Sequence, residues 1–124
     1  VAMAKQFADR THFVHLRSCY IFPNGNFTEA SHLGGRGHLI ELCRIFEKAE
    51  QEGKCNSGRR LPMRVDHGMT FTDEPGGVFD ESNHGHNAGY TLLGRMFAMG
   101  QIQGVIATVD DELGIEYKQP GFYD

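Results

Sequence analysis

The sequence predicts an α/β fold in which short parallel strands alternate with amphipathic helices. Segments rich in strand-forming residues lie at 11–18 and 61–68, and a helical pattern follows each of them along the chain. Strands that alternate with helices are generally parallel, because a parallel pair needs a long crossover connection. The composition, with 40% hydrophobic and 23% charged residues, is typical of a globular protein.

The chain is expected to begin with the end of a helix at residues 1–9, where small and apolar side chains share one face. The first strand is predicted at 11–18, with the sequence THFVHLRS. Alternate residues of a strand point to the same side, so Phe13, His15 and Arg17 are expected on one face.

An irregular excursion is expected at residues 24–37, NGNFTEASHLGGRG, rather than a hairpin, because no second alternating run follows directly. A clear helix then extends from about residue 38 to 52, and Gly53 is expected to end it. Its apolar stripe consists of Leu39, Leu42, Cys43, Phe46 and Ala49.

The second strand is predicted within residues 61–68, LPMRVDHG. A long loop rich in Gly, Asp, Asn and His is expected at 69–89, and loops of that length are usually functional or disordered. A final helix is predicted at about 90–101, and the segment 110–124 is expected to be a polar surface tail.

Two strand–helix units leave both edges of their sheet open and close little core. A closed barrel of alternating strands and helices needs about 250 residues. We therefore expect residues 1–124 to be one fragment of such a barrel, which must pair with more protein.

Composition also restricts the partners and the compartment. A net charge of −4 argues against nucleic acid, which requires a concentrated basic face, and no apolar run is long enough to span a membrane. Cys19, Cys43 and Cys55 are odd in number and lack metal-site spacing, which favours reduced thiols in a cytoplasmic protein.

Candidate chemical groups gather where the two predicted strands end. His15 and Arg17 lie at the carboxyl end of the first strand, Arg64 and Asp66 share a face of the second, and His67 follows them. Catalytic groups of such barrels gather at the carboxyl ends of the strands, so these side chains are expected at one rim.

An imidazole and a carboxylate at one rim suit Mn²⁺, Fe²⁺ or Zn²⁺, but two ligands are too few and others must come from elsewhere. Arg17 and Arg64 could hold a substrate carboxylate through paired N–H groups. Tyr90 could present its hydroxyl to the same rim, although periodicity alone indicates packing. His84 and His86 could form an extra ligand pair, but a solvated loop is the simpler interpretation.

Four motifs, in this order, resemble the C-terminal motifs of the mannonate dehydratase family: HFVHLRS, FTEASHL, LPMRVDHG and NAGYTLLGR. Val65 and Ala88 depart from that pattern, because the family usually has Pro at both positions. The resemblance implies the C-terminal part of a xylose-isomerase-like TIM barrel. It also implies dehydration of D-mannonate to 2-keto-3-deoxy-D-gluconate in hexuronate breakdown, with Mn²⁺ or Fe²⁺, by a homo-oligomer.

The resemblance also implies roles for individual residues. The metal ligands would be His15 and Asp66, and the proton-transfer pair would be His67 and Tyr90, with acid and base unassigned. The substrate-binding residues would be Arg64, Arg17 and His32. The family's other two metal ligands, a histidine and a cysteine, lie upstream, and neither Cys19 nor Cys43 matches that cysteine.

Two alternatives remain open at this point. The chain could be an inactive remnant or an interaction module of that barrel. It could also belong to a related metal-dependent sugar isomerase or epimerase, which uses a similar metal rim.

Overall fold

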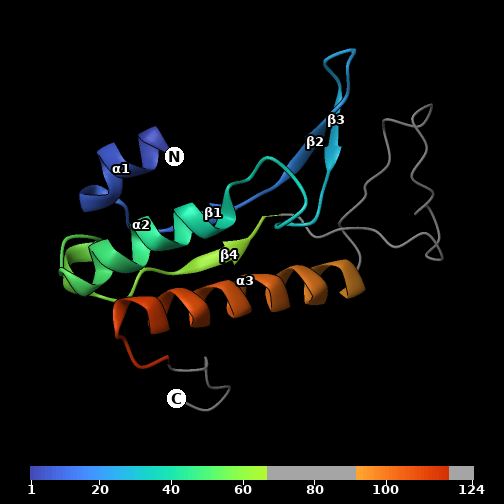
Figure 1. Cartoon of the computed structure of the whole chain (residues 1–124). Helices are drawn as coiled ribbons and strands as arrows, with labels where there is room; N and C mark the ends of the chain where they lie inside the picture. Colours follow the sequence, from blue (N-terminus) through green and yellow to red (C-terminus); the bar gives the residue numbers. More distant parts are fainter. Residues whose placement is uncertain (67–91, 118–124) are drawn as a thin grey trace.

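A computed structural model describes residues 1–66 and 92–117 of the chain (Figure 1). Its helices and strands occur in the order α1 (Ala2–Phe7), a 3-10 helix (Ala8–Arg10), β1 (Val14–Leu16), β2 (Cys19–Ile21), β3 (Phe27–Glu29), α2 (Leu39–Gln51), a 3-10 helix (Asn56–Gly58), β4 (Met63–Val65) and α3 (Leu92–Leu113). The mixed α/β character predicted from the sequence is confirmed. The predicted loop at 69–89 lies outside the described residues.

The central feature is a parallel pair of strands, β1 and β4, with α2 in the connection between them. In this pair Val14 is opposite Met63, His15 is opposite Arg64, and Leu16 is opposite Val65. The parallel arrangement was predicted from the alternation of strand and helix. Both strands are shorter than predicted, with three residues each.

Helix α2 closely matches the prediction. Its C-terminus is closed by two backbone hydrogen bonds, from Gly53 N–H to the Glu50 carbonyl and from Lys54 N–H to the Ala49 carbonyl, each 2.8 Å long. This pattern requires a left-handed residue directly after the helix, and Gly53 adopts φ +67° without the steric penalty of a Cβ.

Helix α3 extends much further than predicted, to Leu113 instead of about residue 101. The expectation of a polar tail from residue 110 was therefore wrong for its first part. Gly100 and Gly104 lower the local helix propensity, and close packing does not require them, because a Cβ at either position would meet no other atom within 4 Å. The helix continues because its buried stripe continues through Ala98, Ile102, Val105 and Val109.

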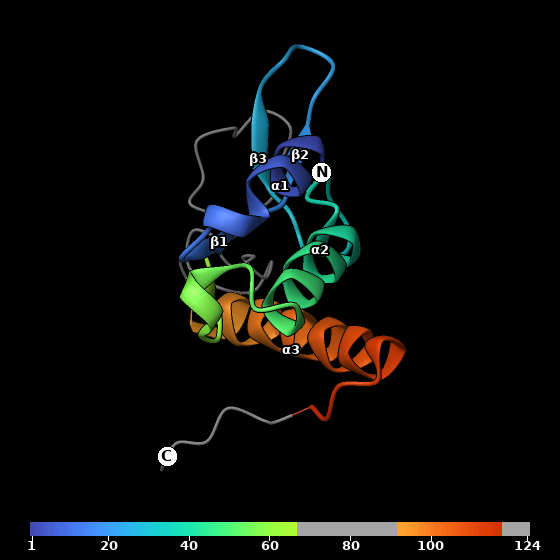
Figure 2. The same ribbon diagram turned by 90° about the vertical axis from the view of Figure 1, so that its left-hand side faces the viewer.

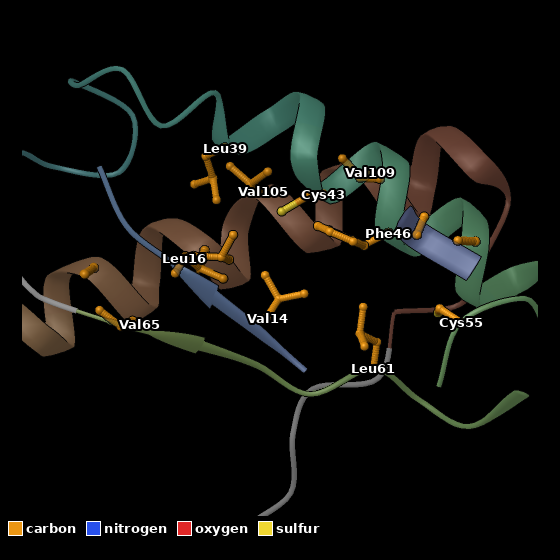
Figure 3. Close-up of a cluster of buried hydrophobic side chains, with 14 residues drawn as sticks. Val14, Leu16, Leu39, Cys43, Phe46, Cys55, Leu61, Val65, Val105 and Val109 are labelled. Carbon is orange, nitrogen blue, oxygen red and sulfur yellow. The ribbon is translucent and has the colours of Figure 1, made fainter. Parts of the chain in front are cut away.

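The hydrophobic core lies on one side of the β1–β4 pair, between the strands and helices α2 and α3 (Figure 3). Val14, Leu16 and Val65 are the strand side chains in this core. The helices contribute mainly Leu39, Cys43, Phe46, Ala98, Ile102, Val105 and Val109. Burial raises the pKa of the Cys43 thiol to about 12, and all three cysteines are free.

Two acidic side chains are buried where α2 and α3 meet. Glu47 is 6% exposed and Asp110 is 3% exposed. Burial is the main reason why the pKa of Glu47 rises to about 7, and the negative charges of Asp110 and Glu50 raise it further. On the surface of the same interface, Arg44 donates two hydrogen bonds to Glu112, of 2.7 and 2.8 Å.

Strands β2 and β3 form an antiparallel hairpin, contrary to the prediction of an irregular excursion. Asn26 closes the turn: its carbonyl accepts from Phe22 N–H over 2.8 Å, and its own N–H donates to the Asn24 side chain over 3.0 Å. Gly25 supplies the positive φ of +87° that the turn needs. The hairpin projects away from the helices (Figures 1 and 2). Within residues 1–66 and 92–117, no helix is long and apolar enough to cross a membrane.

Candidate active site

His15 and Asp66 come together at the carboxyl end of the β1–β4 pair. The neighbours of His15 in β1, Val14 and Leu16, point into the core, so His15 lies on the opposite face and is exposed. Asp66 directly follows β4, and its Oδ1 lies 3.5 Å from Nδ1 of His15. The two side chains are 47% and 28% exposed, respectively. The structure thus places the two predicted metal ligands side by side.

The backbone explains why these two side chains meet. The N–H of Asp66 donates to the carbonyl of Leu16 over 3.0 Å, which continues the ladder one residue beyond β4. The two strands are parallel, so their carboxyl ends lie at the same edge of the sheet. On the other side of His15, the ring of Phe13 packs edge-on against the imidazole, with 4.9 Å between the ring centroids. This contact restricts the imidazole orientation.

Arg17, predicted to bind substrate, contacts the hairpin. It forms an ion pair with Glu29 of β3, and its guanidinium lies 5.4 Å from the centre of the Phe27 ring. The hydrogen bond with Glu29 raises the pKa of Arg17 above its usual value. Arg17 therefore attaches the hairpin to the end of β1. Glu29 was not predicted as its partner, because the hairpin that carries Glu29 was not predicted from the sequence.

Arg64, the second predicted substrate residue, is exposed and opposite His15 in the strand register. It therefore shares the face that carries His15. Arg64 also lines a groove of about 590 Å³ between β4 and α3, together with Arg95 and the apolar side chains of Met63, Met99 and Ile102.

His32, the third predicted substrate residue, is only 3% exposed. Its Nε2 lies 2.9 Å from the Leu16 carbonyl oxygen, and its backbone N–H donates to the Gln101 side chain over 3.0 Å. The role of Gln101 was not predicted, because this residue was expected at the end of a helix that in fact continues to Leu113.

The loop that carries His32 packs tightly against the end of β1. A Cβ on Gly35 would lie 2.2 Å from Oγ of Ser18, and one on Gly37 would lie 2.8 Å from the Arg17 carbonyl. Ser18 is 2% exposed, so these glycines lie against a buried side chain and leave no room for a Cβ at Gly35 or Gly37. The run GGRG in the sequence was the available signal for this contact.

The proton-transfer candidates His67 and Tyr90 lie outside the described residues, as do His84 and His86. Among the residues that are described, no group of three or more His, Cys, Asp or Glu side chains could hold a metal ion. The described part of the site therefore contains His15 and Asp66 with Arg64 beside them.

A comparison with known protein families gives one match of nearly full length: the family model of D-mannonate dehydratase (UxuA) matches residues 1–115. The chain belongs to the D-mannonate dehydratase family. This agrees with the resemblance found in the four sequence motifs.

Individual relatives support the same conclusion. Mannonate dehydratase 2 of Agrobacterium fabrum is 36% identical over 115 residues, which cover 91% of this chain and 27% of that protein. Mannonate dehydratase of Saccharophagus degradans is 34% identical over 112 residues, which cover 89% of this chain and 27% of that protein. Mannonate dehydratase of Chromohalobacter salexigens is 30% identical over 106 residues, which cover 85% of this chain and 25% of that protein. The chain thus spans about a quarter of the length of the curated relatives it matches.

Proposed function

We propose that this chain is the C-terminal part of the TIM barrel of a mannonate dehydratase, a hydro-lyase that converts D-mannonate to 2-keto-3-deoxy-D-gluconate in hexuronate breakdown. The main support is the position of His15 and Asp66, 3.5 Å apart at the carboxyl ends of two parallel strands in a member of that family. TIM-barrel enzymes carry their active sites at this end of the strands.

The donor set fits a divalent metal, Mn²⁺ or Fe²⁺. Two ligands at about 2.1 Å from one ion lie about 3.0 to 3.4 Å apart, close to the separation of the His15 and Asp66 side chains. Both side chains are partly exposed and can be approached from the strand face. A bound metal would stabilise the negative charge that develops on the substrate carboxylate when the neighbouring proton leaves.

The remaining groups have roles that follow from the chemistry of dehydration. Arg64, on the face of His15, would bind the substrate carboxylate through paired N–H groups. One of His67 and Tyr90 would remove the proton next to that carboxylate, and the other would protonate the hydroxyl that leaves as water. Arg17 would contribute less directly to substrate binding, because its guanidinium already forms an ion pair with Glu29.

The rest of the barrel must supply the other metal ligands. Within residues 1–66 and 92–117, β1 and β4 form a sheet of two strands, so each has an edge that a further barrel strand could extend. The free cysteines agree with a cytoplasmic protein. The resemblance to the family suggests a homo-oligomer.

A hybrid protein tests the proposal. In this hybrid, the 124 residues replace the segment that they match in mannonate dehydratase 2 of Agrobacterium fabrum, which then supplies the rest of the barrel. We expect dehydration of D-mannonate that requires Mn²⁺ or Fe²⁺, and the mass of the particle gives its oligomeric state. A folded, metal-loaded hybrid that produces no keto-deoxy product would contradict the proposal. Turnover of ketoses instead would favour the isomerase or epimerase alternative.

A further inference from the structure

The carbonyl oxygen of Leu16 accepts two hydrogen bonds from different parts of the chain. One comes from the backbone N–H of Asp66 over 3.0 Å, and the other involves Nε2 of His32 over 2.9 Å. A carbonyl can only accept, so Nε2 of His32 must carry the proton. Both lone pairs of this oxygen are then used.

This carbonyl belongs to the residue after His15 and accepts a hydrogen bond from the backbone of Asp66, so it is linked to both predicted metal ligands. Leu16 follows His15 in β1, so the orientation of its peptide helps to set where β1 ends and where His15 lies. The same carbonyl fixes the backbone of Asp66 on the neighbouring strand. Any movement of the Leu16 peptide would therefore change the separation of His15 and Asp66, which is 3.5 Å in the structure.

The position of His32 is itself fixed from several sides. His32 is 3% exposed, and its backbone N–H donates to the side chain of Gln101 in α3. Two residues before it, Ala30 N–H donates to the Ser18 carbonyl over 3.0 Å, which anchors the loop to the chain after β1. His32 therefore connects α3 to the carboxyl end of β1.

We propose that His32 is a positioning residue, which holds the Leu16 carbonyl through Nε2 and thereby sets the spacing of His15 and Asp66 for the metal. This inference rests on the proposed function, in which these two residues bind the ion. It differs from the substrate-binding role that the family resemblance implied for His32. Nδ1 of His32 is buried without a hydrogen-bond partner among the described residues, so a substrate role would have to use that atom.

Two substitutions of His32 distinguish the role of Nε2 from that of Nδ1. The amide nitrogen of glutamine can occupy the place of Nε2, so His32→Gln can keep the bond to Leu16 but loses Nδ1. Asparagine is one carbon shorter and reaches only the place of Nδ1, so His32→Asn loses the bond to Leu16. His38→Asn is the matched control: His38 is exposed, and its left-handed φ of +49° is tolerated by asparagine.

The experiment titrates the complete hybrid with Co²⁺ alone and follows the visible absorption of the bound ion, then measures kcat and KM with Mn²⁺. Loss of partners behind metal ligands typically weakens binding about 10- to 100-fold. We expect His32→Asn to weaken Co²⁺ binding at least about tenfold and to change its spectrum. We expect His32→Gln to stay within about threefold of the parent and His38→Asn to match it.

The opposite pattern would overturn the inference. If His32→Asn binds Co²⁺ normally while KM for mannonate rises, or if both His32 variants bind Co²⁺ as the parent does, His32 does not position the ligands. If the parent hybrid binds Co²⁺ but does not dehydrate mannonate, the proposed function fails while the comparison of His32 variants still stands.

Discussion

Glu47 of α2 and Asp110 of α3 are both buried in the helix interface, with 6% and 3% of their surfaces exposed, and the negative charge of Asp110 acts on the Glu47 carboxyl group. Burial disfavours the charged form of Glu47, and the negative charge of Asp110 adds to this effect, so Glu47 holds a proton at a pH where free carboxyl groups are ionised. Arg60, which has a favourable charge interaction with Glu47, offsets only part of this effect.

This pair makes the stability of the fold depend on pH. Burial raises the pKa of Glu47 from 4.5 to about 7, so the folded state binds this proton more tightly than the unfolded state does. The resulting stabilisation is complete below the unfolded pKa of 4.5 and is lost as the pH rises to about 7. We expect the hybrid to lose at most about 3 kcal/mol of stability over that interval through this group.

Glu47→Gln should remove most of this dependence, because the amide keeps the shape and carries no charge. Thermal unfolding between about pH 5 and about pH 8 measures the effect. Glu41→Gln, on the exposed side of the same helix, is the control and should retain the pH dependence of the parent. An unchanged pH profile in Glu47→Gln would show that another group is responsible.

Loss of either predicted ligand should abolish tight metal binding. We expect His15→Ala and Asp66→Asn to weaken Mn²⁺ binding in the hybrid by more than about 100-fold, a larger effect than that of outer-shell changes. Isothermal titration calorimetry measures the affinity. His12→Ala is the matched control, because His12 is exposed near the start of β1, where it contacts Asn56. If both ligand variants retained the Mn²⁺ affinity of the parent, the metal would have to bind at a different site.

The two proton-transfer candidates should affect turnover without affecting the metal. His67→Ala and Tyr90→Phe in the hybrid are expected to lower kcat by about 100-fold or more, since general acid–base groups contribute on that scale. Metal content, measured on the same samples, should remain that of the parent. Metal loss in step with activity would instead identify these residues as ligands or structural groups.

The isolated 124-residue chain should have no dehydratase activity. It has two predicted metal ligands among its described residues, and such a site binds an ion weakly. The edges of β1 and β4 that no described strand covers should also lead it to self-associate. The test is an assay of the purified chain with Mn²⁺ and mannonate, combined with light scattering. Turnover by a monodisperse monomer would disprove the requirement for the rest of the barrel.

The alternation of strands and helices was predictable, because the spacing of apolar residues along the sequence differs between strands and helices. Val14 and Leu16 flank His15 in a period of two, and α2 has an uninterrupted apolar stripe. The meeting of His15 and Asp66 was predictable for the same reason, since parallel strands bring their carboxyl ends to one edge.

The features that the sequence did not predict depend on contacts between distant segments. The second half of α3 is helical because Ile102, Val105 and Val109 are buried in the core, which overrides the weak propensity of Gly100 and Gly104. The hairpin has strands of three residues, too short for an alternating pattern. The contacts of His32 with Leu16 and Gln101 join residues that are 16 and 69 positions apart.

The one-sided core of the β1–β4 pair has a consequence for how this protein can change. Around β1, the even-numbered residues Val14 and Leu16 pack in the hydrophobic core, while the odd-numbered residues Phe13 and His15 are exposed on the opposite face. In β4 the parity is reversed, with Val65 in the core and Arg64 exposed. Substitutions at the exposed positions should therefore alter the chemistry of the site with little loss of stability. Substitutions at the core positions must instead be matched by changes in the helices that pack against them. Within this pair of strands, selection for a new substrate and selection for a stable fold would thus act on separate positions.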